Sequence, residues 1–255
     1  MRAVRDEELP SESTPKSPKG PKKFLIDKNL LPSRGRYYKS DMYARKLTAI
    51  ECKDLSKVRR ETVNAVFNKV IGSAISGVDL ADILVNDKLW LIFYLRAVTY
   101  DDPPMNVIGV CKSCENTKIY QYTLKDLDVK YADKELPEEF DLPNGDKISL
   151  RFPTIDTEME VSKTKADPNL IENIDEDVMT IASHVRTING EVVGIYDAYE
   201  YFVRGNGSAK DFSRLTTILR EYSFGAKPLA KFKCECGDEV FAEVLLTGDF
   251  FLPKL

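Results

Sequence analysis

Two pairs of cysteines constrain the fold of this chain more than any other feature of its sequence. The first pair is Cys111 and Cys114, and the second, far downstream, is Cys234 and Cys236. Alternating apolar and β-branched residues flank each pair, which predicts two β-hairpins that each turn at a cysteine-bearing loop. Four thiolates are a ligand set that Zn²⁺ prefers, and four protein ligands leave no open coordination position. The pattern therefore predicts one structural Zn²⁺ per chain that joins two distant parts of the sequence.

Other roles for these thiols fit the sequence less well. A redox pair of the thioredoxin type lies at the start of a helix, whereas the residues after Cys114 are typical of a strand. A set of buried thiols without metal stays open as an alternative, because Cys234-x-Cys236 is shorter than the usual Cys-x-x-Cys. Gly237 is the residue that a tight turn at this short spacing would use. Cys52, the fifth cysteine, stands alone in the sequence.

The composition indicates a globular protein with a substantial core. The chain has 255 residues, of which 43% are hydrophobic, and this is enough to bury a core. Charged residues make up 31%, yet the net charge is only −4. Non-specific nucleic-acid binding depends on an excess of Lys and Arg, so this balance argues against it as the main activity.

The sequence also predicts the compartment. Its apolar runs fall short of the ~20 residues that span a bilayer, and the N-terminal residues lack the apolar core of a secretory signal. We therefore expect a reducing cytoplasm and no membrane partner. In a reducing compartment, clustered cysteines indicate metal ligands rather than disulfides.

The chain divides into four parts, and the predicted fold class is α+β. Residues 1–23 are rich in Pro, Ser and Lys and predict a disordered arm. Residues 24–154 contain the first hairpin and a buried helix pair, and residues 155–225 change to a helical period that predicts an inserted helical module. Residues 226–255 contain the second hairpin and a C-terminal tail. The expected architecture is a β framework closed by a four-cysteine, zinc-ribbon-like clasp.

Two helices are predicted in the N-terminal part. The first begins near Asp54, which can cap it, and its apolar positions continue to Ile71. The second begins near Asp87 and runs to about Val98. It is apolar nearly all round, which predicts the central buried helix of the fold. Arg96 near its end is expected to be paired or to neutralise the helix C-terminus.

Three helical faces are predicted in the insertion, at 178–185, 195–203 and 212–222. Asn189-Gly190 is expected to form a turn between the first two helices. Ser208 and Asp211 resemble a capping box that opens the third helix.

The sequence shows no arrangement of residues that is typical of a catalytic site. His184 is the only histidine, and neither a nucleophile nor an orienting carboxylate is marked beside it. The run from Gly205 to Gly207 lacks the Lys and Ser/Thr of a phosphate-binding loop. We therefore expect no enzyme activity, no catalytic residues and no small-molecule substrate.

Aromatic residues near the two ends of the folded region are candidate interaction residues. They are Tyr37 and Tyr38 near the start, and Phe250 and Phe251 at the finish. Such side chains either pack on their own domain or anchor a partner, since aromatic residues dominate interface hot spots.

Several segments, taken in their order along the chain, resemble the baseplate proteins of T4-type contractile-tailed bacteriophages, a family that includes baseplate hub and hub-assembly subunits. The likeness covers about residues 24–255. The segments that carry it are Leu31-Pro-Ser-Arg-Gly-Arg-Tyr37, Glu51-Cys-Lys-Asp-Leu55, the stretch from Asp87 to Arg96, Cys111-x-x-Cys114, Phe152-Pro153, Ile188-Asn-Gly190, Cys234-x-Cys236 and Phe250-Phe251-x-Pro253.

The resemblance implies a non-enzymatic role in building a tail baseplate, as a resident subunit or as an assembly factor. Its partners would be other baseplate or tail proteins, met in the host cytoplasm during assembly or kept in the virion. Two alternatives remain. A nucleic-acid-binding zinc-ribbon regulator would use the same cysteines and the basic stretch from Lys16 to Lys23, and a thiol-disulfide oxidoreductase would use the Cys111 thiol.

Overall fold

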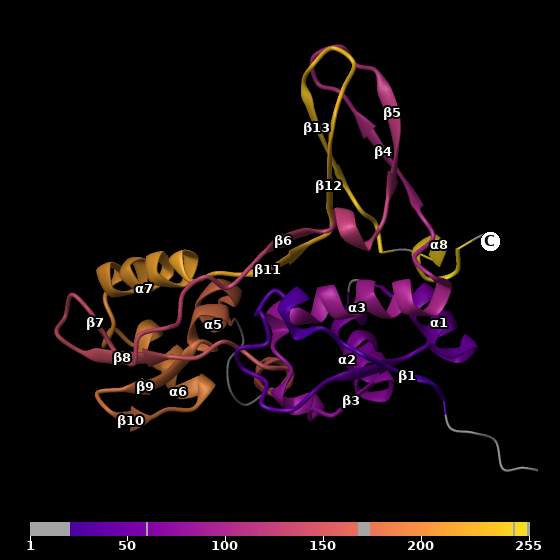
Figure 1. Ribbon diagram of the computed structural model, residues 1–255. Helices are drawn as coiled ribbons and strands as arrows, with labels where there is room; N and C mark the ends of the chain where they lie inside the picture. Colours follow the sequence, from indigo (N-terminus) through magenta and orange to yellow (C-terminus); the bar gives the residue numbers. More distant parts are fainter. Residues whose placement is uncertain (1–20, 60, 168–173, 247, 254–255) are drawn as a thin grey trace, which may run out of the picture.

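The structure, a computed structural model, describes residues 21–59, 61–167, 174–246 and 248–253. The expected disordered arm at residues 1–23 therefore lies almost wholly outside the described residues. The chain forms a first body, an arm that projects from it, and a second lobe beside it (Figure 1). Helices combine with several small antiparallel sheets, which confirms the α+β class.

The first body combines a three-stranded sheet with three helices, of which α2 and α3 contact the sheet and α1 packs against α2. Its elements are β1 (Lys23–Leu25), β2 (Tyr43–Arg45), β3 (Ile75–Ser76), α1 (Ala49–Ser56), α2 (Val63–Ala74) and α3 (Val85–Tyr100). The sheet order is β1-β2-β3, and both strand pairs are antiparallel. Two short 3₁₀ helices, η1 (Lys28–Leu30) and η2 (Leu80–Asp82), complete the body.

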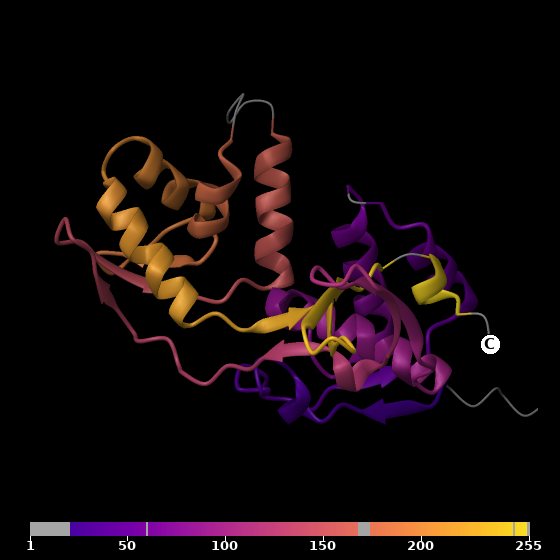
Figure 2. The ribbon, with the colours of Figure 1, turned by 90° about the horizontal axis from the view of Figure 1, so that it is seen from above.

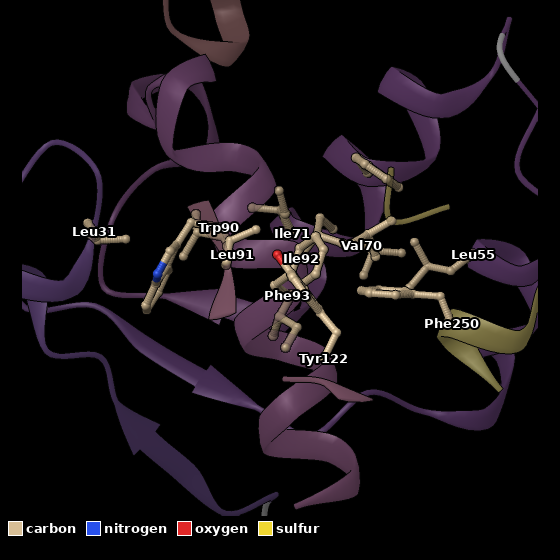
Figure 3. Close-up of a cluster of buried hydrophobic side chains, with 14 of the residues drawn as sticks. Leu31, Leu55, Val70, Ile71, Trp90, Leu91, Ile92, Phe93, Tyr122 and Phe250 are labelled. Atoms are coloured by element: carbon tan, nitrogen blue, oxygen red, sulfur yellow. The ribbon is translucent and has the colours of Figure 1, made fainter. Parts of the chain in front are cut away.

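Helix α3 is the centre of the main hydrophobic core, as its sequence predicts. Trp90, Leu91, Ile92 and Phe93 follow one another along the helix and are all buried. Four consecutive residues cover the whole circumference of a helix, so α3 must be enclosed on every side. Figure 3 shows these side chains among partners from the N-terminal loop, α1, α2, the arm and the C-terminal helix.

The expectation of one helix from Asp54 to Ile71 is wrong, because the chain forms two helices there. α1 begins earlier, where the Thr48 hydroxyl accepts from the Glu51 amide and the Glu51 carboxylate accepts from the Thr48 amide. Asp54 therefore lies in the last turn of α1 and not at its cap. A turn separates α1 from α2, in which the Thr62 amide donates to the Arg59 carbonyl.

The arm consists of two hairpins that lie side by side and project away from the first body (Figure 1). Its strands are β4 (Met105–Val110), β5 (Thr117–Tyr122), β12 (Leu229–Lys233) and β13 (Glu239–Glu243). Strands β4 and β13 lie next to each other. The helices α8 (Gly248–Phe251) and η3 (Leu124–Asp126) lie at the foot of the arm. Both predicted hairpins are confirmed.

The second lobe has a core of its own. Its elements are α4 (Ile155–Ala166), α5 (Glu176–Ala182), α6 (Ile195–Val203), α7 (Ala209–Glu221), β7 (Phe140–Asp141), β8 (Lys147–Leu150), β9 (Val185–Ile188) and β10 (Glu191–Val192). The four strands form one antiparallel sheet in the order β10-β9-β8-β7. Figure 2 shows α4 standing between this lobe and the first body.

The segment 155–225 is therefore not purely helical, which corrects the expectation of a helical module. The three predicted helices are present, but Asn189 and Gly190 form the turn of the β9–β10 hairpin instead of a helix–helix connection. Their φ angles are 52° and 82°, as a two-residue hairpin turn requires. The lobe's core also includes Leu142, Ile148 and Leu150, so it draws on residues on both sides of position 155.

Several contacts connect the parts of the molecule, and a strand pair and an ion pair are among them. Strand β6 (Asp128–Lys130) pairs with β11 (Gly225–Lys227) where the chain passes between the arm and the second lobe. The buried Lys88 ammonium of α3 contacts the Glu158 carboxylate of α4 at 2.6 Å. Within the described residues, none of the helices is both long and apolar enough to cross a membrane.

Candidate metal centre at the tip of the arm

The four paired cysteines meet at the tip of the arm. Cys111 and Cys114 lie in the loop between β4 and β5, and Cys234 and Cys236 lie in the loop between β12 and β13. The sulfur atoms of Cys111 and Cys236 are 3.6 Å apart, and those of Cys114 and Cys234 are 3.5 Å apart. All four sulfurs lie within 4.8 Å of one another. The predicted meeting of the two pairs is therefore present in the fold.

The spacing of these sulfurs fits a tetrahedral metal site. Zn–S bonds of about 2.3 Å in a tetrahedron place the sulfurs about 3.8 Å apart, which is close to the observed separations. Among the described residues, no other group of three or more His, Cys, Asp or Glu side chains is arranged to hold a metal ion. The donor set and its size fit a zinc-like ion, although several other thiophilic ions accept the same four thiolates.

Backbone hydrogen bonds shape both loops. The Cys111 amide donates to the Asn116 carbonyl at 3.0 Å, and the Glu115 amide donates to the Cys111 carbonyl at 2.9 Å. In the second loop the Cys234 amide donates to the Asp238 carbonyl at 2.8 Å. Gly237 has a φ of 98°, a conformation that glycine adopts without steric cost. This turn lets the short Cys-x-Cys direct both sulfurs to the shared site.

The electrostatics of the tip favour a bound cation. The backbone amides of Cys114 and Ser113 donate to the Cys111 sulfur and lower its pKa to about 7. At Cys236 the Asp238 amide lowers the thiol pKa, but the three neighbouring thiols outweigh it and raise the pKa to about 12. Four crowded thiols cannot all ionise together unless a positive charge compensates them. A divalent ion at the centre would supply that charge.

Side-chain packing below the cysteines holds the two hairpins together. The rings of Tyr120 and Phe232 stack with centroids 5.1 Å apart and planes inclined by 2°. A Cβ atom on Gly109 would lie 2.6 Å from Phe232 Cζ and 2.7 Å from Val240 Cγ1. A side chain at position 109 would force Phe232 or Val240 to move, so glycine there allows β4 to approach the other hairpin closely.

Comparison with known protein families identifies the chain. The family described as T4 bacteriophage base plate protein matches residues 27–204, which is more than half of the chain. This chain belongs to the T4 bacteriophage base plate protein family. No curated protein and no solved structure matches it. The family match includes Cys111 and Cys114 but ends before Cys234 and Cys236.

Sequence segments that carry the resemblance to baseplate proteins meet in the first body. The Ser33 hydroxyl of the first segment donates to the Asp87 carboxylate at 2.6 Å. The Tyr37 ring lies edge-on to Phe152, with centroids 5.4 Å apart. The Val85 amide at the start of α3 donates to the Pro153 carbonyl at 3.0 Å. In this baseplate protein, the segments around residues 33, 87 and 153 thus form one contact region.

An ion bound by all four cysteines of this baseplate protein would have no open position for a substrate. Four protein ligands complete a tetrahedral site, so an ion held there would be structural. Both cysteine pairs lie in loops between strands, away from the helix N-terminus that activates thioredoxin-like thiols. The membership of the family indicates a structural role in a phage tail baseplate.

The four aromatic candidate residues differ in accessibility. Tyr37 is 41% exposed, whereas Tyr38, Phe250 and Phe251 are buried in the core of their own chain. The Phe93 and Phe250 rings pack edge to face with centroids 4.8 Å apart. Buried side chains cannot contact a partner unless the fold opens. The burial of Tyr38, Phe250 and Phe251 fits the alternative that such side chains pack on their own domain, and Tyr37 is the accessible one of the four.

Arg96 and Asp87 are buried ionisable residues of α3 with different partners. Arg96 Nε donates to the Phe250 carbonyl at 2.8 Å, and Nη1 donates to the Pro103 carbonyl at 3.0 Å, so the expected pairing is confirmed. Asp87 accepts from Ser33 and Tyr38. From the sequence, Asp87 was expected only to mark the start of a helix. A charged residue in a helix that is otherwise apolar all round could have indicated that its carboxylate has buried hydrogen-bond partners.

His184 lies beside the Ser183 hydroxyl, which is 3.5 Å from its Nδ1 atom. It follows α5, and its Nδ1 atom hydrogen-bonds the Thr180 carbonyl at 2.9 Å. Burial is the main reason that its pKa lies below the ordinary value.

Proposed function

We propose that this chain is a non-enzymatic structural or assembly subunit of the hub region of a contractile-tail baseplate. We further propose that its arm is fastened at the tip by one Zn²⁺ bound to Cys111, Cys114, Cys234 and Cys236. The observation that carries the proposal is the convergence of four sulfurs within 4.8 Å at the end of a projecting arm. The family match supports the baseplate role, and the resemblance to hub and hub-assembly subunits supports the place within the baseplate.

The two hairpins of the arm need an interaction that holds them together. Its two hairpins are separate two-stranded sheets, and an isolated two-stranded hairpin is marginally stable in water. At the tip, the Lys118–Glu235 ion pair at 3.5 Å is exposed, and exposed ion pairs contribute little. A metal ion that binds the folded arm and not the unfolded chain would stabilise it by its binding free energy.

The partners proposed for this subunit are other baseplate or tail proteins. A nucleic-acid-binding regulator with the same cysteines is the alternative, and the charges of the arm disfavour it. The basic residues of the strands and loops of the arm are Lys112, Lys118, Lys231 and Lys233, and the acidic residues are Glu115, Glu235, Asp238, Glu239 and Glu243. This balance gives no excess of positive charge for phosphate binding. Thiol-disulfide exchange, the second alternative, lacks a helix N-terminus at either cysteine pair.

Metal analysis and virion composition test the two halves of the proposal. Elemental analysis of the purified chain should give about one zinc per chain, and Cys114→Ser or Cys234→Ser should remove it. Cys52→Ser is the matched control, because Cys52 is also a buried cysteine but lies outside the cysteine centre. Its sulfur contacts the Tyr100 hydroxyl, which also bonds the Phe251 carbonyl of α8. A chain without metal, whose stability is unaffected by Cys114→Ser, would overturn the zinc site.

Mass spectrometry of purified virions distinguishes a resident subunit from an assembly factor that leaves the particle. Phage carrying a deletion of this gene should fail to complete the baseplate in either case. Normal tails made without the protein would overturn the proposed function.

A further inference from the structure

A pocket at the foot of the arm has a buried cation on its wall. It has a volume of about 440 Å³ and lies where α3, β4, β13 and α8 meet (Figure 1). Among the described residues that line it, Arg96 of α3 is the only cation, and this residue is 2% exposed. Burial of a charge is costly unless the charge is paired and hydrogen-bonded. The partners of Arg96 therefore decide what this pocket can bind.

The guanidinium of Arg96 has one unused nitrogen. Nε donates to the Phe250 carbonyl and Nη1 donates to the Pro103 carbonyl, but within the described part of the chain Nη2 has no hydrogen-bond partner. The ion pair of Arg96 there is with Asp102, whose Oδ1 lies 4.0 Å from Nη1. That separation is too long for a hydrogen bond. The Phe250 ring, with its centroid 5.1 Å from Cζ, packs on the guanidinium without replacing the missing acceptor.

This unused donor favours an anion over a neutral group. Burial lowers the pKa of Arg96 below its ordinary value, and the Asp102 carboxylate offsets this only in part. A neutral acceptor would complete the hydrogen bonds of Arg96 but would leave its charge unbalanced. A carboxylate does both, and hydrogen bonds between a guanidinium and a carboxylate are roughly twice as strong as those between neutral groups.

The rest of the wall is mostly apolar. Met105, Val107, Val244 and Phe250 are among the residues that form it. Its other polar residues are Asn106 and Glu243, and both are exposed. A carboxylate that reaches Arg96 is therefore surrounded by apolar side chains, which strengthens its attraction to the guanidinium.

The mouth of the pocket continues into an exposed apolar surface. Ile108 and Leu245 line the pocket and are each 64% exposed. Ile119 lies opposite Ile108 in the register of β4 and β5 and is 61% exposed. A small free acid would balance the charge of Arg96 but leave these side chains in water, whereas a protein segment would cover them. The site thus fits a carboxylate that belongs to a protein.

We propose that the pocket binds the side-chain carboxylate of an Asp or Glu that is flanked by apolar residues on a neighbouring baseplate protein. This inference rests on the baseplate role proposed above, which supplies the class of partner. The carboxylate accepts from Arg96 Nη2, and the flanking residues cover Ile108 and Leu245. The exposed Glu243 opposes the approach of a second carboxylate, so removal of its charge should strengthen binding.

Photo-crosslinking in infected cells identifies the partner segment. p-Benzoylphenylalanine in place of Leu245 puts the crosslinking group at the mouth of the pocket, and mass spectrometry of the crosslinked tails and tail intermediates gives the partner peptide. We expect a segment of a baseplate protein with an Asp or Glu close to the crosslinked residue. The same replacement at Val192, which is 81% exposed on the second lobe, is the matched control and should not capture this segment.

Calorimetry with a synthetic peptide of that segment and the purified full chain tests the role of the carboxylate. Replacement of the acidic residue by its amide should weaken binding by about tenfold or more. Arg96→Lys keeps the charge but not the planar fork, and it should cause a loss of similar size.

Two substitutions on β13 separate the pocket from the rest of the arm. Glu243→Gln should strengthen binding by about threefold at low salt, because it removes a like charge from the wall. Glu239→Gln is the matched control, since Glu239 lies outside the pocket, where it pairs with Lys231 at 3.1 Å. It makes the same change of net charge and should leave the affinity unchanged.

The outcomes distinguish the pocket from the baseplate role. Circular dichroism shows whether Arg96→Lys folds, and the amide peptide and Glu243→Gln decide the question without altering Arg96. Absence of a crosslinked segment, a segment without an acidic residue, or equal affinities of the acidic and amide peptides would overturn the carboxylate pocket. A carboxylate-dependent complex with a protein outside the tail would instead contradict the baseplate partner and with it the proposed function.

Discussion

The Tyr38 hydroxyl donates a hydrogen bond of 2.7 Å to the buried carboxylate of Asp87. The same hydroxyl accepts from the Leu84 amide at 3.0 Å, while the Ser33 amide and hydroxyl donate to the two carboxylate oxygens at 2.9 and 2.6 Å. These bonds fix the loop before β2 to the first turn of α3. Burial raises the pKa of Asp87 above its ordinary value, so the hydrogen bonds are needed to offset the cost of enclosing the carboxylate.

Removal of the Tyr38 hydroxyl should destabilise the protein. Tyr38→Phe keeps the ring but removes one donor to a buried carboxylate, which is expected to cost about 1.5–3 kcal/mol of unfolding free energy. Urea denaturation followed by circular dichroism measures the change. Tyr37→Phe is the matched control, since Tyr37 is 41% exposed, and it should change stability by less than about 0.5 kcal/mol. Equal effects of the two substitutions would contradict the role assigned to Asp87.

The lowered pKa of Glu51 should make the free energy of unfolding depend on pH in the acidic range. Its pKa is lowered to about 2, mainly by the side-chain hydrogen bonds from Arg45. Burial opposes this shift, and weaker hydrogen bonds from Ser73 and from the amide and hydroxyl of Thr48 add to it. The pKa in the folded chain thus lies below the unfolded value of 4.5. This stabilisation is complete above about pH 4.5 and is lost as the pH falls toward 2.

Glu51→Gln should flatten that part of the pH profile, as measured by thermal unfolding between pH 5 and pH 2 (a range set by the folded and unfolded pKa values). Arg45→Met should have a similar effect on the slope, because Arg45 is the main cause of the lowered pKa. An unchanged slope in both variants would show that Glu51 is not held ionised by Arg45.

Gly109 should be intolerant of any side chain. Gly109→Ala places a methyl group within 3 Å of Phe232 and Val240, so the hairpins must separate or the ring must move, at a cost of about 1–3 kcal/mol. Hydrogen exchange on β4 and β12 reports the loosening directly. Phe232→Leu combined with Gly109→Ala should recover part of the loss, and a double variant with the full summed loss would argue against this contact.

Loss of one partner of the Lys88–Glu158 pair should strongly destabilise the contact between the first body and α4. Lys88 is 6% exposed, and its ammonium contacts both Glu158 oxygens at 2.6 Å. Burial lowers the pKa of Lys88, although Glu158 partly offsets this. Lys88→Met leaves Glu158 without its cation and is expected to cost about 3–5 kcal/mol.

The double variant Lys88→Met, Glu158→Leu separates charge from packing. It should regain most of the stability lost by Lys88→Met, because both members of the pair are then apolar. Thermal unfolding of the two single variants and the double variant completes the cycle. Additive losses would indicate that the two residues act independently.

The elements with strong local signals could be predicted from the sequence. α3 carries apolar residues on all sides, the Ser208–Asp211 capping box opens α7, and both cysteine hairpins alternate with a period of two. α4 shows no such signal, because only Ile155 and Thr157 on it are buried. The strands β7 and β10 have two residues each, which is too short for a period to appear.

The candidate metal centre was predictable in its donors but not in its geometry. Thiol type and spacing within each pair are local properties of the sequence, and by themselves they indicate a metal. The short Cys234-x-Cys236 left open whether both sulfurs could reach one ion. The turn at Gly237 and the close packing at Gly109 decide this, and both depend on contacts between distant segments.

The sequence by itself determined the α+β class, the central helix and the two cysteine hairpins, because these follow from local spacing and periodicity. The likeness to baseplate proteins came from a resemblance of several segments in their order along the chain. Only the tertiary structure decided that Phe250 and Phe251 are buried, that Asp87 fastens the N-terminal loop, and that one face of β4–β5 is left bare. Which surfaces are covered is set by packing between segments far apart in the chain, and no local pattern contains that information.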